Sequence, residues 1–158
     1  MKIKFMLLAL ISSIFLLMSS PSFAHHGYSR FDGSRPLYLS GVIQKIYWGQ
    51  PHVEITVRTE GRTPPPSLAK QPIPEGGVIP KNLRIAAKGD WKIVISTIIK
   101  LERRGLKAAD VAVGKRIMMV AYPSCDDRNG GRAELLWVDG GKNYWVRDAA
   151  AQTMCKAP

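Results

Sequence analysis

The stretch from residue 38 to residue 57 constrains the fold most, because it carries the clearest strand periodicity in the chain. Val53, Ile55 and Val57 alternate with polar side chains, a period of two that predicts a β-strand with one buried and one solvated face. The preceding run is rich in β-branched and aromatic residues, so it is also expected to be a strand. Gly41 within it indicates a bend or bulge of the kind that a small barrel needs. The sequence therefore predicts two consecutive strands joined by a short corner at residues 49–51.

Shorter runs of the same character follow. Strands are expected at residues 83–87, 91–96, 115–122, 132–138 and 142–146, with a hairpin signal at Asp139-Gly140-Gly141. Residues 97–104 are expected to form a two-turn helix that ends at Gly105, where a positive φ costs little. One short helix between the third and fourth main strands predicts an all-β fold, a small OB-like Greek-key β-barrel of five to six strands. An open β-sandwich is the alternative.

A proline-rich segment, residues 60–80, interrupts this order of strands. Proline lacks a backbone donor and cannot continue a β-ladder, so the segment is expected to be a long surface loop, partly polyproline II or disordered. The predicted organisation is an N-terminal arm at 25–37, one barrel domain at 38–147 that contains this loop, and a C-terminal tail at 148–158.

The first 24 residues are expected to be a cleaved signal peptide. Lys2 and Lys4 give a positive start, residues 6–18 are apolar apart from two serines, and residues 22–24 offer the small side chains that signal peptidase requires. The apolar run is short for a transmembrane helix, which needs about 20 residues, although a retained anchor is the alternative. The mature chain, residues 25–158, is therefore predicted to be periplasmic, without stable membrane insertion.

The chain is strongly basic, with a net charge of +11, or +9 without Lys2 and Lys4. A basic balance often indicates a nucleic-acid partner, but export would leave lipid headgroups, lipopolysaccharide phosphates and acidic glycans as the available polyanions. The basic residues are dispersed apart from Arg103-Arg104, which favours a solvated basic surface over one dedicated site. Nucleic acid is therefore not expected as a partner.

The chain has two cysteines, Cys125 and Cys155. In an oxidising compartment such a pair is expected to form a disulfide, which would tie the C-terminal tail to a loop. No C-x-x-C motif is present, so catalytic redox use is not expected. A shared metal site is the less favoured alternative.

Four short motifs occur in order along the first third of the chain. They are Ala24-His25-His26-Gly27-Tyr28, Phe31-Asp32, Gly41-Val42-Ile43 and Trp48-x-x-Pro51-His52. Together with a later strand-helix-Gly-Leu block, they resemble a family of small exported bacterial proteins of undefined function. Gln50 stands where the family usually has asparagine, and the proline-rich insertion is longer than expected. The resemblance implies an exported OB-like domain, and it implies no activity or catalytic residues.

The three histidines suggest a metal site. A chain that begins at His25 can chelate Cu(II) through its amine and Nδ1, and His26 or His52 can supply a further imidazole in a planar arrangement. Tyr28 or Asp32 would lie nearby. Two alternatives stay open: the histidine pair binds metals adventitiously, and His52 is a corner residue hydrogen-bonded to the backbone or to His26.

A second hypothesis is an envelope interaction module that binds a protein partner or an anionic polymer through the basic surface and aromatic loops. OB barrels bind oligomers on the face of their second and third strands. Most aromatic side chains are expected in the core, and Trp48 and Tyr28 are the candidates for ligand contact.

No catalytic residues are predicted. The serines lie in no nucleophile-elbow context, and the acidic pair Asp126-Asp127 is typical of a solvated glycine-rich turn. No glycine-rich phosphate loop follows a strand. The chain is therefore expected to be a binding protein. A copper redox enzyme is the one catalytic class that any sequence feature, the three histidines, supports.

Overall fold

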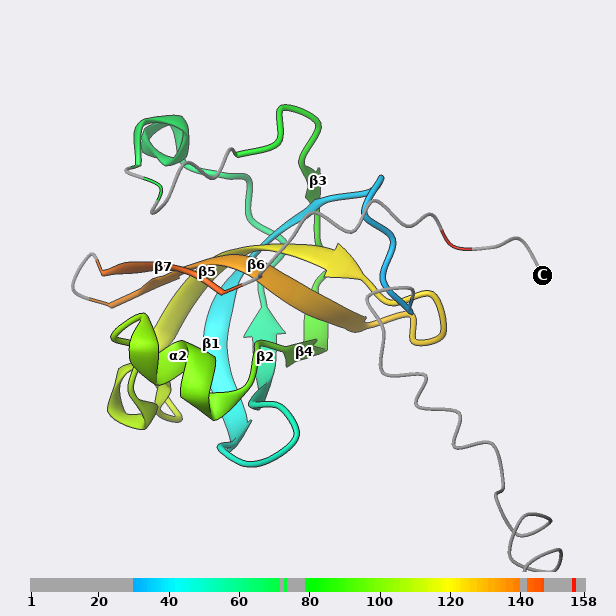
Figure 1. Ribbon diagram of the computed structural model, residues 1–158. Helices are drawn as coiled ribbons and strands as arrows, with labels where there is room; N and C mark the ends of the chain where they lie inside the picture. Colours follow the sequence, from blue (N-terminus) through cyan, green and yellow to red (C-terminus); the bar gives the residue numbers. More distant parts are fainter. Residues whose placement is uncertain (1–29, 72, 74–78, 140–141, 147–154, 156–158) are drawn as a thin grey trace, which may run out of the picture.

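The structure is a computed structural model that describes residues 30–71, 73, 79–139, 142–146 and 155. Five strands close into a barrel: β1 (Leu37–Tyr47), β2 (Glu54–Thr59), β4 (Gly89–Val94), β5 (Arg116–Pro123) and β6 (Gly130–Val138). They pair in the order β1-β2-β4-β6-β5, and β5 returns to β1 (Figure 1). All these pairs are antiparallel except β4 with β6, which run parallel. The predicted small Greek-key barrel is confirmed.

Two further strands extend the sheet at its edges. β3 (Arg84–Ile85) pairs in parallel with the start of β1, and β7 (Asn143–Trp145) pairs antiparallel with β6. The predicted helix is present as α2 (Ile98–Arg103), between β4 and β5, and it buries Leu101 in the core. Gly105 follows it with a φ of +80°, as expected of a residue that ends a helix. A short 3-10 helix, η4 (Ala108–Val111), leads from there to β5.

The barrel interior is filled by the apolar side chains that alternate with polar ones along the strands. Ile55 and Val57 of β2 point inward and are fully buried, whereas Glu54 and Thr56 remain half-exposed on the outer face. The same core cluster includes Trp91 and Tyr144. The period of two in the sequence therefore separates a dry interior from a polar outer face on β2.

The proline-rich segment covers a second apolar face, outside the barrel. It contains a 3-10 helix, η2 (Pro66–Lys70), drawn in green at the top of Figure 1. Leu68 of this helix is buried, and it packs with Ile73, Ile79 and Leu83 around Trp137. The described part of the segment is a loop, as expected, with polyproline II angles at Pro65 (φ −67°, ψ 146°) and one 3-10 turn that was not expected. Its described apolar side chains pack against the outer side of the sheet.

Gly41 has a different role from the one expected. The irregularity in β1 lies between Ile43 and Lys45, not at Gly41. A Cβ atom at Gly41 would lie 2.1 Å from the carbonyl oxygen of Arg58 on the neighbouring strand. Glycine is thus needed here because the backbones of β1 and β2 approach closely.

Residues 1–29, with the predicted signal peptide, His25, His26 and Tyr28, lie outside the described residues. In the described ranges, the structure contains no helix with the length and apolar character needed to cross a membrane.

Candidate ligand-binding site

An open pocket of about 350 Å³ lies on the outer face of the barrel, where β2, β4 and β6 meet two loops. The first loop, residues 48–53, joins β1 to β2, and the second, residues 124–129, joins β5 to β6. Twelve residues line the pocket: Arg30, Phe31, Pro51, His52, Glu54, Lys92, Val94, Ser124, Asp127, Gly130, Gly131 and Arg132. In barrels of this type, the face of the second and third strands and these two loops are where oligomeric ligands bind.

Strand register explains why a hollow forms there. Lys92 of β4 lies opposite Gly130 of β6, and Val94 lies opposite Arg132. Gly130, which pairs with Lys92, places no side chain on the pocket side, where an added Cβ would lie 2.8 Å from the Asp127 side chain. Gly131 faces the core, because a Cβ there would meet the buried Ile93 side chain and the backbone oxygen of Tyr122, both at 3.1 Å. Glycine at position 130 therefore leaves room beside Lys92, and glycine at position 131 fits the close packing behind it.

The N-terminal arm forms one wall of the pocket by pairing with the second loop. Phe31 forms an isolated antiparallel bridge with Ser124. The Cys125 amide donates a hydrogen bond to the Arg30 carbonyl oxygen (2.8 Å), and the Asp32 amide donates to Pro123 (2.9 Å). Three segments that are distant in sequence thus meet at one site: the arm, the corner at His52 and the second loop.

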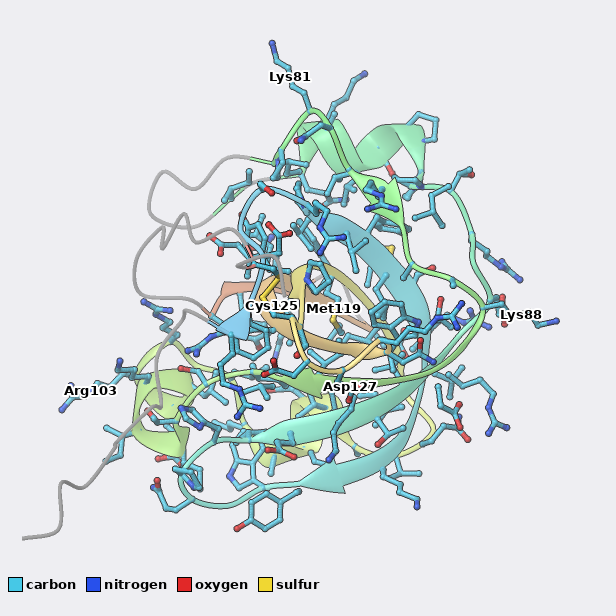
Figure 2. The ribbon with its side chains drawn as sticks, turned by 90° about the vertical axis from the view of Figure 1, so that its right-hand side faces the viewer. Lys81, Lys88, Arg103, Met119, Cys125 and Asp127 are labelled. Atoms are coloured by element: carbon cyan, nitrogen blue, oxygen red, sulfur yellow. A yellow bond between two sulfur atoms is a disulfide. The ribbon has the colours of Figure 1, made fainter. Side chains whose placement is uncertain are left out.

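The second loop is also fixed from within. The Ser124 hydroxyl oxygen accepts hydrogen bonds from the amides of Asp126 and Asp127, each at 3.2 Å. The Asp127 carboxylate accepts one from the Asn129 amide (3.0 Å). Figure 2 shows Asp127 facing the viewer near the middle of the molecule, whereas Lys81 points outward at its top edge. This hydrogen bonding sets the conformation of the loop before any ligand binds.

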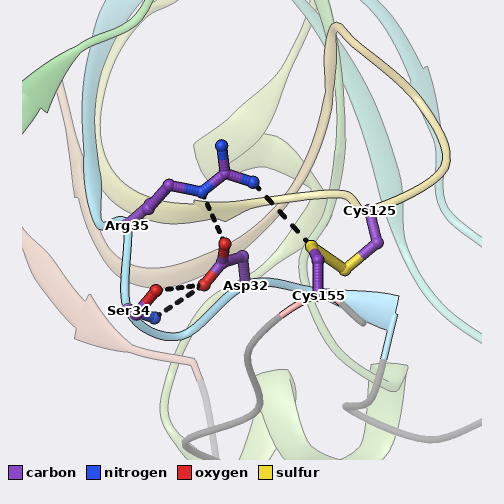
Figure 3. Close-up of polar contacts among 5 residues, drawn as sticks. All are labelled: Asp32, Ser34, Arg35, Cys125 and Cys155. Atoms are coloured by element: carbon purple, nitrogen blue, oxygen red, sulfur yellow. Dashed lines mark hydrogen bonds and ion pairs between the residues drawn. A yellow bond between two sulfur atoms is a disulfide. The ribbon is translucent and has the colours of Figure 1, made fainter. Parts of the chain in front are cut away.

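The expected disulfide is confirmed and anchors this loop. Cys125 and Cys155 are bonded, with their Cα atoms 5.5 Å apart. Figure 3 shows that Arg35 of the arm reaches both groups, with Nη2 directed at the Cys155 sulfur (3.8 Å) and Nε at the Asp32 carboxylate. The C-terminal cysteine, the loop and the arm are therefore held together beside the pocket.

Asp32 is the buried carboxylate of this assembly, with 4% of its surface exposed. It accepts hydrogen bonds from the Ser34 amide (2.9 Å), the Ser34 hydroxyl (2.6 Å) and the Arg35 guanidinium. Burial alone would raise the pKa of Asp32, but these donors outweigh it and lower the pKa below its ordinary value. Asp32 is thus engaged within the arm and does not line the pocket.

Asp32→Asn is expected to lower the free energy of unfolding at pH 7 by about 1–3 kcal/mol, because it removes a buried charged acceptor. The pKa of Asp32 is lower in the folded state, so its contribution is present above the unfolded pKa of about 4 and disappears as the pH falls through the folded value. The gap between wild type and variant should therefore shrink at pH 3 in urea denaturation. Asp126→Asn is the control, since its ion pair with Arg30 is 58–59% exposed and should contribute less than about 1 kcal/mol. Equal losses for both variants at pH 7 would contradict this role.

Basic groups outnumber acidic groups in the pocket. Arg30, Lys92 and Arg132 face two carboxylates, Glu54 and Asp127. The charge of Arg30 is partly neutralised by Asp126, whose carboxylate oxygen lies 2.9 Å from Arg30 Nε. Arg132 is buried, with 8% of its surface exposed. Lys92 is exposed, and no carboxylate of the described residues lies within ion-pair distance of it. An anionic group is the complement of this charge.

Of the site residues predicted from the sequence, one lines the pocket, one packs elsewhere and three lie outside the described residues. His52 lines the pocket and is half-exposed, whereas Trp48 packs against the core and is not among the lining residues. His25, His26 and Tyr28 lie outside the described residues. In the described ranges, no group of three histidine, cysteine, aspartate or glutamate side chains is arranged to hold a metal ion.

Sequence reasoning missed most of the pocket's charged residues, above all Lys92 and Arg132. One signal could have found them: Lys92 lies on the polar side of an alternating strand, and Arg132 directly follows Gly130-Gly131 at the start of another. In a barrel of this topology, these two strands are neighbours.

Comparison with protein families gives one match. The profile of a family of unknown function (DUF6152) matches residues 14–65, about a third of the chain, a range that includes β1, β2 and His52. No curated protein matches the chain. No solved structure matches it either. The match fits the resemblance to an uncharacterised family that the motifs indicate.

Proposed function

We propose that this protein is a binding protein whose pocket, between the corner at His52 and the loop 124–129, receives an anionic group of its ligand. The exposed ammonium group of Lys92 carries this proposal, because no carboxylate of the described residues lies within ion-pair distance of it, whereas the neighbouring Arg30 is already paired with Asp126. The loops that frame the pocket are fixed by hydrogen bonds, and such preorganisation lowers the entropic cost of binding.

The proposed role is binding, not catalysis. Ser124 is the one hydroxyl side chain among the lining residues, and its oxygen accepts two backbone hydrogen bonds within its own loop. A nucleophilic serine needs a base within hydrogen-bond reach. The side chains that face the pocket are suited to holding charge and accepting hydrogen bonds.

Lys92→Gln tests the proposal, with inorganic phosphate as the probe. Phosphate is expected to bind with a Kd of about 1 mM at low ionic strength, and Lys92→Gln should weaken binding about tenfold, because a charge-assisted contact is lost. Isothermal calorimetry measures both values. Lys81→Gln is the matched control, since Lys81 is an exposed lysine outside the pocket. The same phosphate affinity in both variants would refute the proposal.

A copper site is the second candidate, and one observation favours it. The arm residues Arg30 and Phe31 line the same pocket as His52. His26 precedes Arg30 by four residues, a span of at most about 14 Å for an extended chain. A chain beginning at His25 could therefore bring its amine and the imidazoles of His25 and His26 to His52, the nitrogen donors that Cu(II) prefers.

Cu(II) titration of a chain that begins at His25, without an N-terminal tag, tests this candidate. A one-to-one complex with nitrogen hyperfine structure in electron paramagnetic resonance, weakened at least tenfold by His52→Ala, would support it. Binding that is unaffected by His52→Ala would restrict copper to the His25-His26 arm.

We also propose that the protein works in the periplasm. The positive start, the apolar run and the small residues Ser22 and Ala24 are typical of a signal peptide, and the Cys125–Cys155 disulfide suits an oxidising compartment. N-terminal sequencing of protein recovered from a periplasmic fraction should begin at His25.

A further inference from the structure

The outer face of the barrel continues from the pocket across β2 to β1. Strand register places Lys45 of β1 opposite Thr56 of β2, and Thr56 opposite Lys92 of β4. The next row joins Tyr47 of β1 to Glu54 of β2, which lines the pocket. Because directly paired residues project from the same face of a sheet, these two rows form one continuous surface that leads into the pocket.

The first row carries two lysines whose backbone spacing is fixed by the strand register. Lys45 and Lys92 are exposed and lie two strand spacings apart, about 10 Å. Among the described carboxylates, none lies within ion-pair distance of Lys45, which acts on Asp90 only at longer range. Arg58, further along the face, is different, because it is bonded to Asp90 at 2.8 and 3.0 Å. The row thus presents two positive charges, separated by the Thr56 hydroxyl.

Tyr47 adds a rigid aromatic surface at the end of the second row. Tyr47 is 54% exposed, whereas Tyr38, Trp91, Trp137 and Tyr144 are buried. The Tyr47 hydroxyl donates a hydrogen bond to the Gln50 carbonyl oxygen (2.8 Å). A Cβ at Gly49 would lie 2.4 Å from the ring, so the ring rests directly on this glycine. An exposed aromatic ring that is held in place provides contact area at low entropic cost.

We infer that the ligand is an acidic oligosaccharide that extends from the pocket across β2 to Tyr47, an inference that rests on the proposed function. Its carboxylates pair with Lys92 in the pocket and with Lys45 on β1. Its hydroxyls donate to Glu54 and exchange hydrogen bonds with Thr56. A pyranose ring packs its apolar face on Tyr47. Lysines alone would suit any polyanion, whereas an aromatic platform and a carboxylate acceptor in the same surface suit a charged sugar.

Oligogalacturonates of one and six units are the probes, measured by calorimetry at fixed ionic strength. The hexamer is expected to bind at least tenfold more tightly than the monomer, because only the hexamer reaches from Lys92 to Tyr47. Tyr47→Ala should weaken hexamer binding about tenfold and Lys45→Gln about fivefold, while neither changes inorganic phosphate binding. Lys81→Gln should leave all affinities unchanged. The substituted side chains are exposed, and circular dichroism confirms that each variant is folded.

Three results would overturn the inference. The first is equal affinity for monomer and hexamer, and the second is hexamer binding that is unchanged in Tyr47→Ala. The third is six-unit polyphosphate binding as tightly as the hexamer and losing no affinity in Tyr47→Ala, which would mean that charge alone is recognised. If any of these occurs while Lys92→Gln still weakens phosphate binding, the proposed anion pocket is retained and only the oligosaccharide ligand is rejected. If Lys92→Gln has no effect on phosphate, the proposed function itself fails.

Discussion

Replacing Cys125 and Cys155 together by serine is expected to lower the free energy of unfolding by about 3–4 kcal/mol. The disulfide closes a loop with a sequence separation of 30 residues, and the chain-entropy model gives that magnitude for a loop of this length. The bond lies beside the arm, since Arg35 donates to the Cys155 sulfur and the Cys125 amide donates to the Arg30 carbonyl oxygen, so its loss should loosen the loop 124–129. Urea denaturation of oxidised wild type and the double variant measures the loss.

The same double variant should bind inorganic phosphate several-fold more weakly, because its second loop is less well fixed beside the pocket. Wild type treated with a thiol reductant is the control and should match the variant in both stability and affinity. A stability loss below about 1 kcal/mol, with unchanged phosphate affinity, would contradict the role assigned to this bond.

Gly41→Ala is expected to lower the free energy of unfolding by about 3 kcal/mol, at the upper end of the range for overpacking. The added Cβ would lie 2.1 Å from the Arg58 carbonyl oxygen and 2.7 Å from its carbon, both backbone atoms. Gly41 pairs with Thr59 on one side and with Ile117 on the other. The clash therefore cannot be relieved without disturbing a ladder of the barrel. Thermal and urea unfolding measure the loss.

Gly114→Ala is the matched control for this substitution. Gly114 has a φ of +86°, but a Cβ added there would meet no atom within 4 Å. Alanine at this position should therefore lower the free energy of unfolding by about 1–2 kcal/mol, the cost of holding a residue with a Cβ in the left-handed conformation. A smaller loss for Gly41→Ala than for Gly114→Ala would show that the β1–β2 approach is not tight.

The barrel could be predicted from the sequence because its strands are short and carry strong local signals. The alternation of Val53, Ile55 and Val57 marks β2, and Gly105 marks the end of α2. The fold of the proline-rich segment could not be predicted in the same way. In its described part, Leu68 and a few isolated apolar residues join a cluster that includes Trp137, and such packing leaves no period in the local sequence.

The pocket was only partly predictable, because it is assembled from residues far apart in the chain. His52 stood out through its corner motif, whereas Lys92 and Arg132 resemble any solvated residue of a basic protein. They become neighbours through the parallel pairing of β4 with β6, which no local pattern encodes. Trp48, which was expected to contact a ligand, is partly buried and packs against the core, a contact that its place beside the corner does not reveal.

Amide chemical-shift mapping of the isotope-labelled protein with inorganic phosphate is the decisive test of the anion pocket. A phosphate ion held in the pocket should produce saturable shifts at the amides of Gly130, Gly131 and Lys92 and in the loop 124–129, and these shifts should disappear in Lys92→Gln. Shifts that do not saturate and that are spread over exposed lysines such as Lys81 and Lys88 would mean that phosphate only screens a basic surface, and would contradict a binding pocket.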